Sequence, residues 1–180
     1  MVTFNANSDI HSLRKLNEGE TIQSFNCGDT ELNDFILKNA ENYRKTLLAV
    51  SYVLEEQGIP IAYFSLSNDN LSFENFKEKS TFNRLNRKIN NAKRMRQYPA
   101  MKIGRLAIDN DQKNKGIGSE LLHLIKTFLI TNPQSGCRFV TVDAYNDAIP
   151  FYQKNGFKMM NEFQDKQHTQ PMFFDLAELL

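Results

Sequence analysis

The chain has 180 residues, of which 41% are hydrophobic and 24% are charged. This composition is that of a globular protein with its own core, and it excludes disorder, collagen and coiled coil as descriptions of the whole chain. No apolar run approaches the roughly 18 residues of a membrane helix, and the N-terminus lacks a secretory signal pattern. The cysteines, Cys27 and Cys137, do not make a disulfide framework. We therefore expect a single domain over residues 1–180, located in the cytoplasm, with reduced thiols and no membrane partner.

The net charge of +1 is unevenly distributed along the chain. Residues 77–96 carry eight basic side chains and one acidic side chain, a net charge of +7 that leaves −6 for the rest. An anionic partner is therefore to be sought beside this segment, although such charge runs are more often a solvated helix face.

The first half of the chain shows helical and extended patterns in turn. A capping residue at Asp29 precedes apolar residues at helical spacing over residues 32–43. Strands are expected at residues 47–54 and 61–66, joined by a hairpin turn. The polar and basic stretch at residues 70–97 is expected to form one or two helices.

A strand with an interruption is expected at residues 101–109. The apolar residues before Gly104 lie on one phase of the strand, and those after it lie on the other. A phase change around a glycine indicates a β-bulge, which predicts that the neighbouring strands splay near this point.

The second half of the chain is expected to continue as a long amphipathic helix, a strand, a short helix and two closing strands. These elements are expected at residues 117–130, 138–144, 147–155, 157–160 and 172–176. The pattern as a whole predicts an α/β domain with a mixed, twisted sheet and helices on both faces.

A glycine turn separates the strand at residues 101–109 from the helix that follows. Its residues are Lys113, Asn114, Lys115, Gly116, Ile117, Gly118 and Ser119. Glycines allow a ligand to approach the backbone, and the free N–H groups at a helix start favour a phosphate. A Walker loop does not fit because Ser119 and Glu120 follow the second glycine, and a dinucleotide fingerprint does not fit because Leu121 takes the place of its third glycine. A plain loop is the alternative.

A second motif follows one strand later, with Asn146 preceding the run Phe151-Tyr152-Gln153-Lys154-Asn155-Gly156-Phe157. With both motifs, the chain resembles the GNAT family of N-acetyltransferases. These enzymes carry a Gln/Arg-x-x-Gly-x-Gly/Ala turn, and after the next strand an Asn and a helix ending in Phe-Tyr-x-x-x-Gly-Phe. The resemblance covers about residues 47–176. It departs from the family pattern at Lys113, where Gln or Arg is usual.

The resemblance implies an enzyme that moves an acetyl group from acetyl-CoA to a primary amine by direct attack. It implies that the glycine turn, residues 113–119, holds the pyrophosphate. It also implies that the pantetheine arm pairs with the main chain of Leu106, Ala107 and Ile108. Unpaired N–H groups there would polarise the thioester carbonyl. An ordinary buried strand is the alternative.

Tyr152 is the candidate general acid, since a phenol can protonate the leaving thiolate. Without the motif, a core tyrosine next to Phe151 would be the simpler interpretation. Asn146 either caps the helix that follows it or hydrogen-bonds the cofactor arm. Asp109 is a candidate general base, but a turn-forming role is the stronger interpretation and water can carry the proton. The histidines show no metal spacing with either cysteine, so no metal is predicted.

The acceptor is not set by these motifs. Three segments look like a GNAT subgroup that includes toxins acetylating the amino group of aminoacyl-tRNA: Phe25-Asn26-Cys27-Gly28-Asp29, Phe64-Ser65-Leu66-Ser67 and residues 104–109. The candidate acceptors are therefore a small-molecule amine, a protein amine, or tRNA bound through residues 77–96. A non-catalytic acyl-CoA-binding module and a homodimer are also compatible with the sequence.

Overall fold

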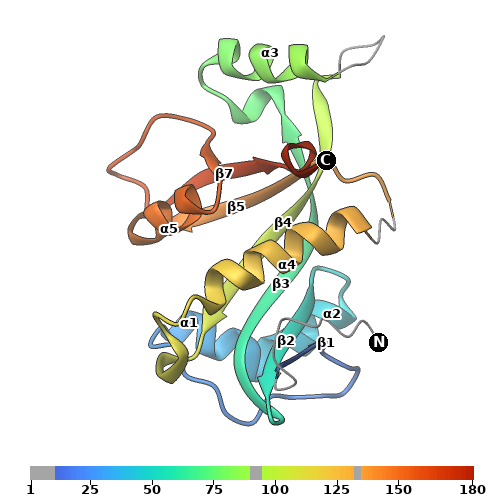
Figure 1. The fold of residues 1–180 in the computed structure, drawn as a ribbon, viewed down its shortest axis with the longest axis vertical. Helices are drawn as coiled ribbons and strands as arrows, with labels where there is room; N and C mark the ends of the chain where they lie inside the picture. Colours follow the sequence, from blue (N-terminus) through green and yellow to red (C-terminus); the bar gives the residue numbers. More distant parts are fainter. Residues whose placement is uncertain (1–10, 90–94, 132–134) are drawn as a thin grey trace. The chain divides into compact units, whose positions relative to one another are not determined.

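The computed structural model describes residues 11–89, 95–131 and 135–180 (Figure 1). The strands of these residues are β1 (His11–Lys15), β2 (Val50–Glu56), β3 (Ile59–Ser72), β4 (Gln97–Ile108), β5 (Phe139–Tyr145), β6 (Lys158–Met159) and β7 (Thr169–Asp175). The α-helices are α1 (Thr30–Asp34), α2 (Ala40–Lys45), α3 (Lys79–Lys88), α4 (Ile117–Thr131) and α5 (Ile149–Lys154). A π-helical turn joins α1 to α2, and short 3-10 turns flank several other elements.

The seven strands form one sheet in the order β1-β2-β3-β4-β5-β7-β6. The pairs β1–β2, β2–β3, β5–β7 and β6–β7 are antiparallel, whereas β4–β5 is parallel. The fold is therefore a mixed α/β sheet with helices, as predicted.

The chain divides into two compact units. The first comprises residues 1–67 and 103–121, and the second comprises residues 68–102 and 122–180. Strands β3 and β4 and helix α4 each contribute to both units. A single domain over residues 1–180 stays a prediction.

The core of the first unit is built around Tyr63, whose ring packs against Phe25 and Phe35 at centroid distances of 5.3 and 6.1 Å. The Tyr63 hydroxyl donates to the backbone oxygen of Leu32 (2.7 Å) and so ties β3 to α1. Asp29 caps α1, as predicted, because its Oδ1 accepts the Leu32 N–H (2.9 Å).

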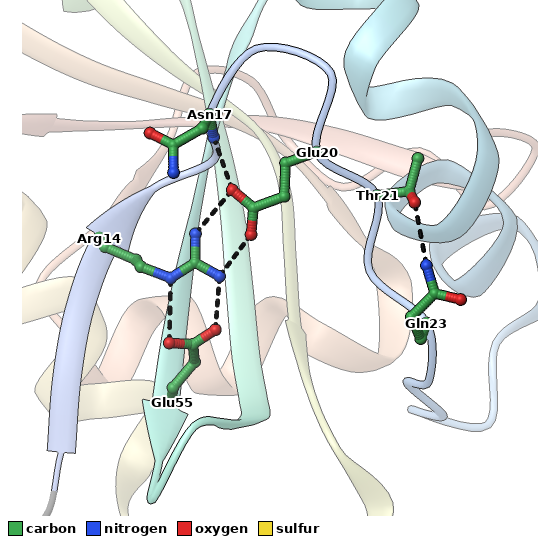
Figure 2. Close-up of polar contacts among 6 residues, drawn as sticks. All are labelled: Arg14, Asn17, Glu20, Thr21, Gln23 and Glu55. Carbon is green, nitrogen blue, oxygen red and sulfur yellow. Dashed lines mark hydrogen bonds and ion pairs between the residues drawn. The ribbon is translucent and has the colours of Figure 1, made fainter.

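Edge strand β1 is attached to the first unit by a network around Arg14 (Figure 2). The guanidinium donates to both carboxylate oxygens of Glu55 on β2 (3.0 and 2.6 Å) and to both of Glu20 (2.9 and 2.6 Å). Glu20 also accepts the N–H of Asn17 (3.0 Å). Planar, bidentate pairs of this kind are stronger than single contacts, so one arginine holds the strand and the loop that follows it.

The core of the second unit is aromatic. The ring of Phe82 on α3 lies 6.1 Å from Tyr98 on β4 and 5.6 Å from Phe76, and Tyr98 in turn packs against Phe139 on β5. The Tyr98 hydroxyl donates to the side-chain oxygen of Asn86, so α3 is joined to β4 by a hydrogen bond as well as by packing.

Several element boundaries differ from the predictions. β1 was not predicted, and the helix expected over residues 32–43 is interrupted by the π-helical turn. The strand expected from residue 47 begins at Val50, because Leu47 has a positive φ of 59° and is 92% exposed. The described residues of the stretch 70–97 contain one α-helix and one 3-10 turn, while β3 runs on to Ser72 and β4 begins at Gln97. Exposed polar residues near the end of β3 concealed its extended pattern.

The phase change in β4 does not fall where it is predicted. The buried residues are Tyr98 and Ala100, then Ile103 and Ala107, so the parity of the buried positions changes between Ala100 and Ile103. Across Gly104, the buried residues Ile103 and Ala107 keep the same parity. Strand β4 pairs in parallel with β5 over Ala100–Lys102. Splaying of the strands near residues 104–108 stays a prediction. A bulge at Gly104 stays a prediction.

The Arg14 network leads to a prediction about acid stability. The hydrogen bonds from Arg14 hold the pKa of Glu20 below its usual 4.5. A carboxylate whose pKa is lower in the folded state than in the unfolded state stabilises the fold at pH values above its unfolded-state pKa. This stabilisation is lost as the pH falls through the folded-state pKa. Glu20→Gln should therefore lower the free energy of unfolding by about 1–2 kcal/mol at pH 7. The difference should shrink below about pH 4.

Urea denaturation of the wild type and of Glu20→Gln, at pH 7 and below about pH 4, measures this difference in the free energy of unfolding. Glu18→Gln is the matched control, because the Glu18 side chain is 79% exposed and lies 3.6 Å from Arg44. Equal effects of the two substitutions at pH 7 would show that the network does not stabilise the first unit.

Candidate active site

The glycine turn lies in the first unit, between the end of β4 and the start of α4. A 3-10 turn at Asn110–Gln112 follows β4, and α4 begins at Ile117. Gly116 has a φ of +86° and Asn114 a φ of +63°. A Cβ added to Gly116 would meet no heavy atom within 4 Å, so the backbone conformation, rather than a lack of space, requires glycine there.

The backbone of the turn presents a run of unpaired donors. The N–H groups from Asn114 to Gly118 have no acceptor among the described residues. On either side of this run, the N–H of Lys113 donates into the preceding 3-10 turn and that of Ser119 donates to the oxygen of Gly116 (2.9 Å). Consecutive free N–H groups at a helix start form an anion site. These free N–H groups lie within residues 113–119, where backbone contacts to the pyrophosphate stay a prediction.

Asp109 joins the start of this turn to the N-terminal segment. Its Oδ1 accepts the N–H of Asp111 (3.1 Å), and its Oδ2 accepts the N–H of Asn26 (3.1 Å). The oxygen of Asn26 in turn accepts the N–H of Asn110 (2.9 Å). Both carboxylate oxygens of Asp109 are thus used in shaping the turn, which favours the turn-forming interpretation over that of a general base.

Lys113, which departs from the family pattern, uses its side chain within the protein. Its Nζ donates to the backbone oxygen of Cys27 (2.6 Å), whereas Lys115 Nζ donates to Gln112 within the turn (2.9 Å). The neighbouring Gly28 has a φ of +84°, and a Cβ there would come within 3.2 Å of Asn110. The glycine turn and residues 26–28 therefore pack closely against each other. No pattern in the sequence predicts this contact between two segments more than 80 residues apart.

The strand before the turn belongs to the first unit's core. Ala107 is buried in it, while Leu106 and Ile108 are half-buried. The N–H of Asp109 donates to the oxygen of Ile61 on β3 (2.9 Å), so the end of β4 is anchored to its neighbour.

Tyr152 lies in the second unit, on α5. Its ring packs edge-on against Phe151 and Phe157, with centroids 5.1 and 5.4 Å away, and the residue is 7% exposed. Burial raises the pKa of Tyr152 well above its ordinary value of 10, so the phenol is protonated at neutral pH. Its hydroxyl donates to no acceptor among the described residues, whereas the hydroxyl of Tyr63, which is also buried, donates to a backbone oxygen.

The helix that carries Tyr152 ends as predicted. Gly156 has a φ of +83°, and a Cβ there would lie 2.9 Å from the Phe174 ring, so both backbone conformation and packing require glycine.

The prediction that Asn146 caps this helix is wrong. The residue preceding α5 is Ala148, and no side chain caps the helix. Asn146 instead starts a 3-10 turn, and its side chain turns toward the loop before β7: Nδ2 donates to the oxygen of Gln167 (2.8 Å), and Oδ1 accepts from Gln170 Nε2 (3.2 Å). Gln170 is fully buried, so this amide pair holds the loop. A role toward the cofactor arm is not tested by these contacts.

Neither a metal site nor a membrane span is found in the part of the chain that the structure describes. Within residues 11–89, 95–131 and 135–180, no group of three or more His, Cys, Asp or Glu side chains is placed to hold a metal ion. No helix in the same ranges is long and apolar enough to cross a bilayer.

The family model described as "Acetyltransferase (GNAT) domain" matches residues 74–173, more than half of the chain. The protein therefore belongs to the GNAT family of acetyltransferases, and it is an acyltransferase that uses acetyl-CoA as its co-substrate. A search of curated protein sequences finds no significant match.

Solved structures of bacterial toxins share the fold. AtaT in complex with acetyl-methionyl-tRNA is 20% identical, with a TM-score of 0.70 and coverage of 94% of this chain and 96% of that chain. A variant of KacT is 17% identical, with a TM-score of 0.70 and coverage of 95% and 99%. AtaT bound to the C-terminus of the antitoxin AtaR and acetyl-CoA is 19% identical, with a TM-score of 0.65 and coverage of 95% and 96%.

The turn geometry predicts the effect of replacing its glycine. Gly116→Val should reduce the affinity for acetyl-CoA at least tenfold, because a β-branched residue resists positive φ and reorients the free N–H groups. Gly58→Val is the matched control: Gly58 also has a positive φ (80°) and open space around its Cβ, but it lies in the hairpin between β2 and β3.

Isothermal titration with acetyl-CoA measures both affinities, and thermal unfolding confirms that both variants are folded. Wild-type affinity in Gly116→Val would remove the assignment of this turn as the pyrophosphate site.

Proposed function

We propose that this enzyme acetylates a primary amine by direct attack on acetyl-CoA, with the pyrophosphate bound at the glycine turn. The observation that carries the proposal is the run of five unpaired N–H groups from Asn114 to Gly118, at the start of a fifteen-residue helix in a GNAT chain. Such a run binds an anion through backbone dipoles, which the side chains of Lys113 and Lys115 reinforce by their charge. The main chain of residues 106–108 is proposed to pair with the pantetheine arm.

The reaction requires two proton transfers. The amine lone pair attacks the thioester carbonyl carbon, the carbonyl electrons form an oxyanion, and its collapse breaks the C–S bond and releases a thiolate. We propose that Tyr152 donates its phenolic proton to that thiolate, and that water accepts the proton lost by the amine. The Tyr152 hydroxyl donates to no acceptor among the described residues and, as a phenol, carries its proton at neutral pH, so it is available for this donation.

Removing the Tyr152 hydroxyl tests the acid role. Tyr152→Phe should lower kcat by about 100- to 10,000-fold and leave the affinity for acetyl-CoA unchanged. Tyr63→Phe is the matched control, since it removes the hydroxyl of another buried tyrosine whose bond to Leu32 is structural. That variant should lose about 1 kcal/mol of stability and keep kcat within a few-fold.

Steady-state kinetics with a reactive amine and a free-thiol readout measure both variants. A kcat for Tyr152→Phe within a few-fold of wild type would reduce Tyr152 to a packing residue.

Helix α3 carries a surface that favours one class of acceptor. Arg84, Arg87 and Lys88 are exposed and spaced i, i+3 and i+4, so they lie on one face, and none has an ion-pair partner among the described residues. Other basic residues of the segment are engaged: Lys79 Nζ donates to two backbone oxygens, and Arg96 pairs with Glu74 (2.8 Å). Of the other three, Lys77 is exposed just before α3, and the two at positions 93 and 94 lie outside the described residues.

The second candidate function is therefore acetylation of aminoacyl-tRNA, with the phosphate backbone bound on the basic face of α3. Three free cations on one helix face suit a polyanion better than a small cationic amine. The structural similarity to AtaT, captured with acetyl-methionyl-tRNA, agrees with this choice. A small-molecule or protein amine is the competing acceptor. With either acceptor we expect the enzyme to act in the cytoplasm.

Reversing the charge of this face distinguishes the acceptors. The triple variant R84E/R87E/K88E should lower acetylation of charged tRNA steeply and flatten the log–log salt dependence of tRNA binding by about one unit per lost phosphate contact. Its affinity for acetyl-CoA should stay within a few-fold of wild type. The matched control replaces Lys38 and Lys45, exposed lysines of the first unit, by Glu.

Acetylation of charged tRNA and of a polyamine is measured in parallel at low and moderate salt. An active triple variant with unchanged tRNA acetylation at both salt concentrations would exclude RNA binding through α3.

A further inference from the structure

Lys126 is a basic residue in an apolar environment. It lies on α4 among the buried residues Leu122, Ile125 and Leu129, and it is only 6% exposed. Lysine is almost never buried without a partner, because desolvating an ammonium is costly. The contacts that compensate this cost therefore indicate what the residue does.

The Lys126 ammonium contacts the end of the helix that carries Tyr152. Its Nζ donates to the backbone oxygen of Asn155 (2.5 Å), the residue that terminates α5. The same nitrogen lies 3.8 Å from the ring centroid of Phe174 on β7 and 5.1 Å from that of Phe157. A hydrogen bond to a terminal carbonyl and a cation–π contact both stabilise a charged group at a helix C-terminus.

The two residues that Lys126 contacts at this end of α5 also hold Tyr152. The N–H of Asn155 donates to the oxygen of Tyr152 (3.1 Å), and the N–H of Phe157 donates to the same oxygen (3.0 Å). The Phe157 ring packs edge-on against the Tyr152 ring. A shift at the end of α5 would therefore be transmitted to the tyrosine through both backbone and ring.

We propose that Lys126 is a positioning residue for the reaction: its ammonium fixes the C-terminal end of α5 and thereby the phenol of Tyr152. This inference rests on the proposed role of Tyr152 as general acid. Misplacing a reacting group by about 1 Å can cost about 100-fold in rate. Loss of the Lys126 contacts, called the clamp below, would therefore lower kcat if it moved the phenol by such a distance.

The protonation state of Lys126 adds a pH dependence to this role. Burial lowers the pKa of Lys126 to about 8, and Glu178, on the 3-10 turn after β7, raises it in part. Glu178 is itself paired with Lys158 on β6, whereas the contacts from the end of α5 and from β7 are uncharged. Below pH 8 the ammonium makes both contacts. Above pH 8 the neutral amine loses the cation–π contact, so the clamp weakens as pH rises.

The test is a double-mutant cycle between Lys126→Met and Tyr152→Phe. Lys126→Met should lower kcat about 10- to 100-fold, with the KM for acetyl-CoA within a few-fold of wild type. In the Tyr152→Phe background the same change should have little further effect, because the group that it positions is gone. The wild-type advantage in kcat over Lys126→Met should decline as pH rises through about 8. Lys126→Arg, which keeps charge and donors, should restore part of the rate.

Two further measurements separate this role from a merely structural one. Hydrogen exchange of the amides at residues 149–157 should become faster in Lys126→Met, while the thermal unfolding curve stays cooperative. Lys154→Met is the matched control, because Lys154 is an exposed lysine on α5 itself, and it should leave kcat and exchange unchanged.

The outcomes are distinct. An unaffected kcat in Tyr152→Phe would overturn the role of Tyr152 as general acid, and the positioning role of Lys126 would fall with it. A large loss in Tyr152→Phe with an unaffected kcat in Lys126→Met would overturn the clamp alone. Two losses that multiply in the double variant would show that Lys126 acts on the reaction by a route other than Tyr152.

Discussion

Five consecutive backbone N–H groups, from Asn114 to Gly118, have no acceptor among the described residues, so these groups do not fix the conformation of the glycine turn. Internal bonds define part of it, because the Gly116 oxygen accepts the N–H of Ser119 (2.9 Å) and Lys115 Nζ donates to Gln112 (2.9 Å). Glycine at position 116 makes the conformation accessible, and contacts from outside the turn help to hold it.

Those external contacts come from a segment more than 80 residues earlier in the chain. Asp109 bonds the backbone of Asn26, and Lys113 bonds the backbone of Cys27, one on each side of the 3-10 turn. Both are hydrogen bonds with a charged partner, which are about twice as strong as neutral ones. The N-terminal segment therefore supports the turn that is proposed to bind the pyrophosphate. Lys113 stands where the family pattern has Gln or Arg, and its side chain reaches the Cys27 carbonyl.

The second unit carries the proposed general acid. The Tyr152 phenol holds its proton at neutral pH as an ordinary phenol does, and the phenylalanine rings and backbone bonds at the end of α5 hold the residue in place. Burial raises the pKa of this phenol and lowers the pKa of the Lys126 ammonium, which is proposed to fix the end of α5.

The features predicted from the sequence are those set by local spacing. The glycine turn, the long helix after it, the cap at Asp29 and the end of α5 at Gly156 all follow from patterns within about ten residues. The features missed depend on contacts between distant residues. The partners of Asn146 are Gln167, in the loop before β7, and Gln170, on β7, and Lys126 looks in sequence like a polar position beside an apolar stripe. Edge strand β1 pairs with β2 over His11–Lys15, but Leu13 is its one apolar residue, so no periodicity indicated it.

The most direct test of the account is a titration of the labelled protein with coenzyme A, followed by amide NMR. Coenzyme A carries the pyrophosphate without the acetyl group, so binding is observed without turnover. The account predicts that the largest amide shifts fall at residues 114–118, with smaller shifts at residues 26–28, whose bonds support the turn. Saturable binding that leaves the amides of residues 114–118 unchanged would contradict it.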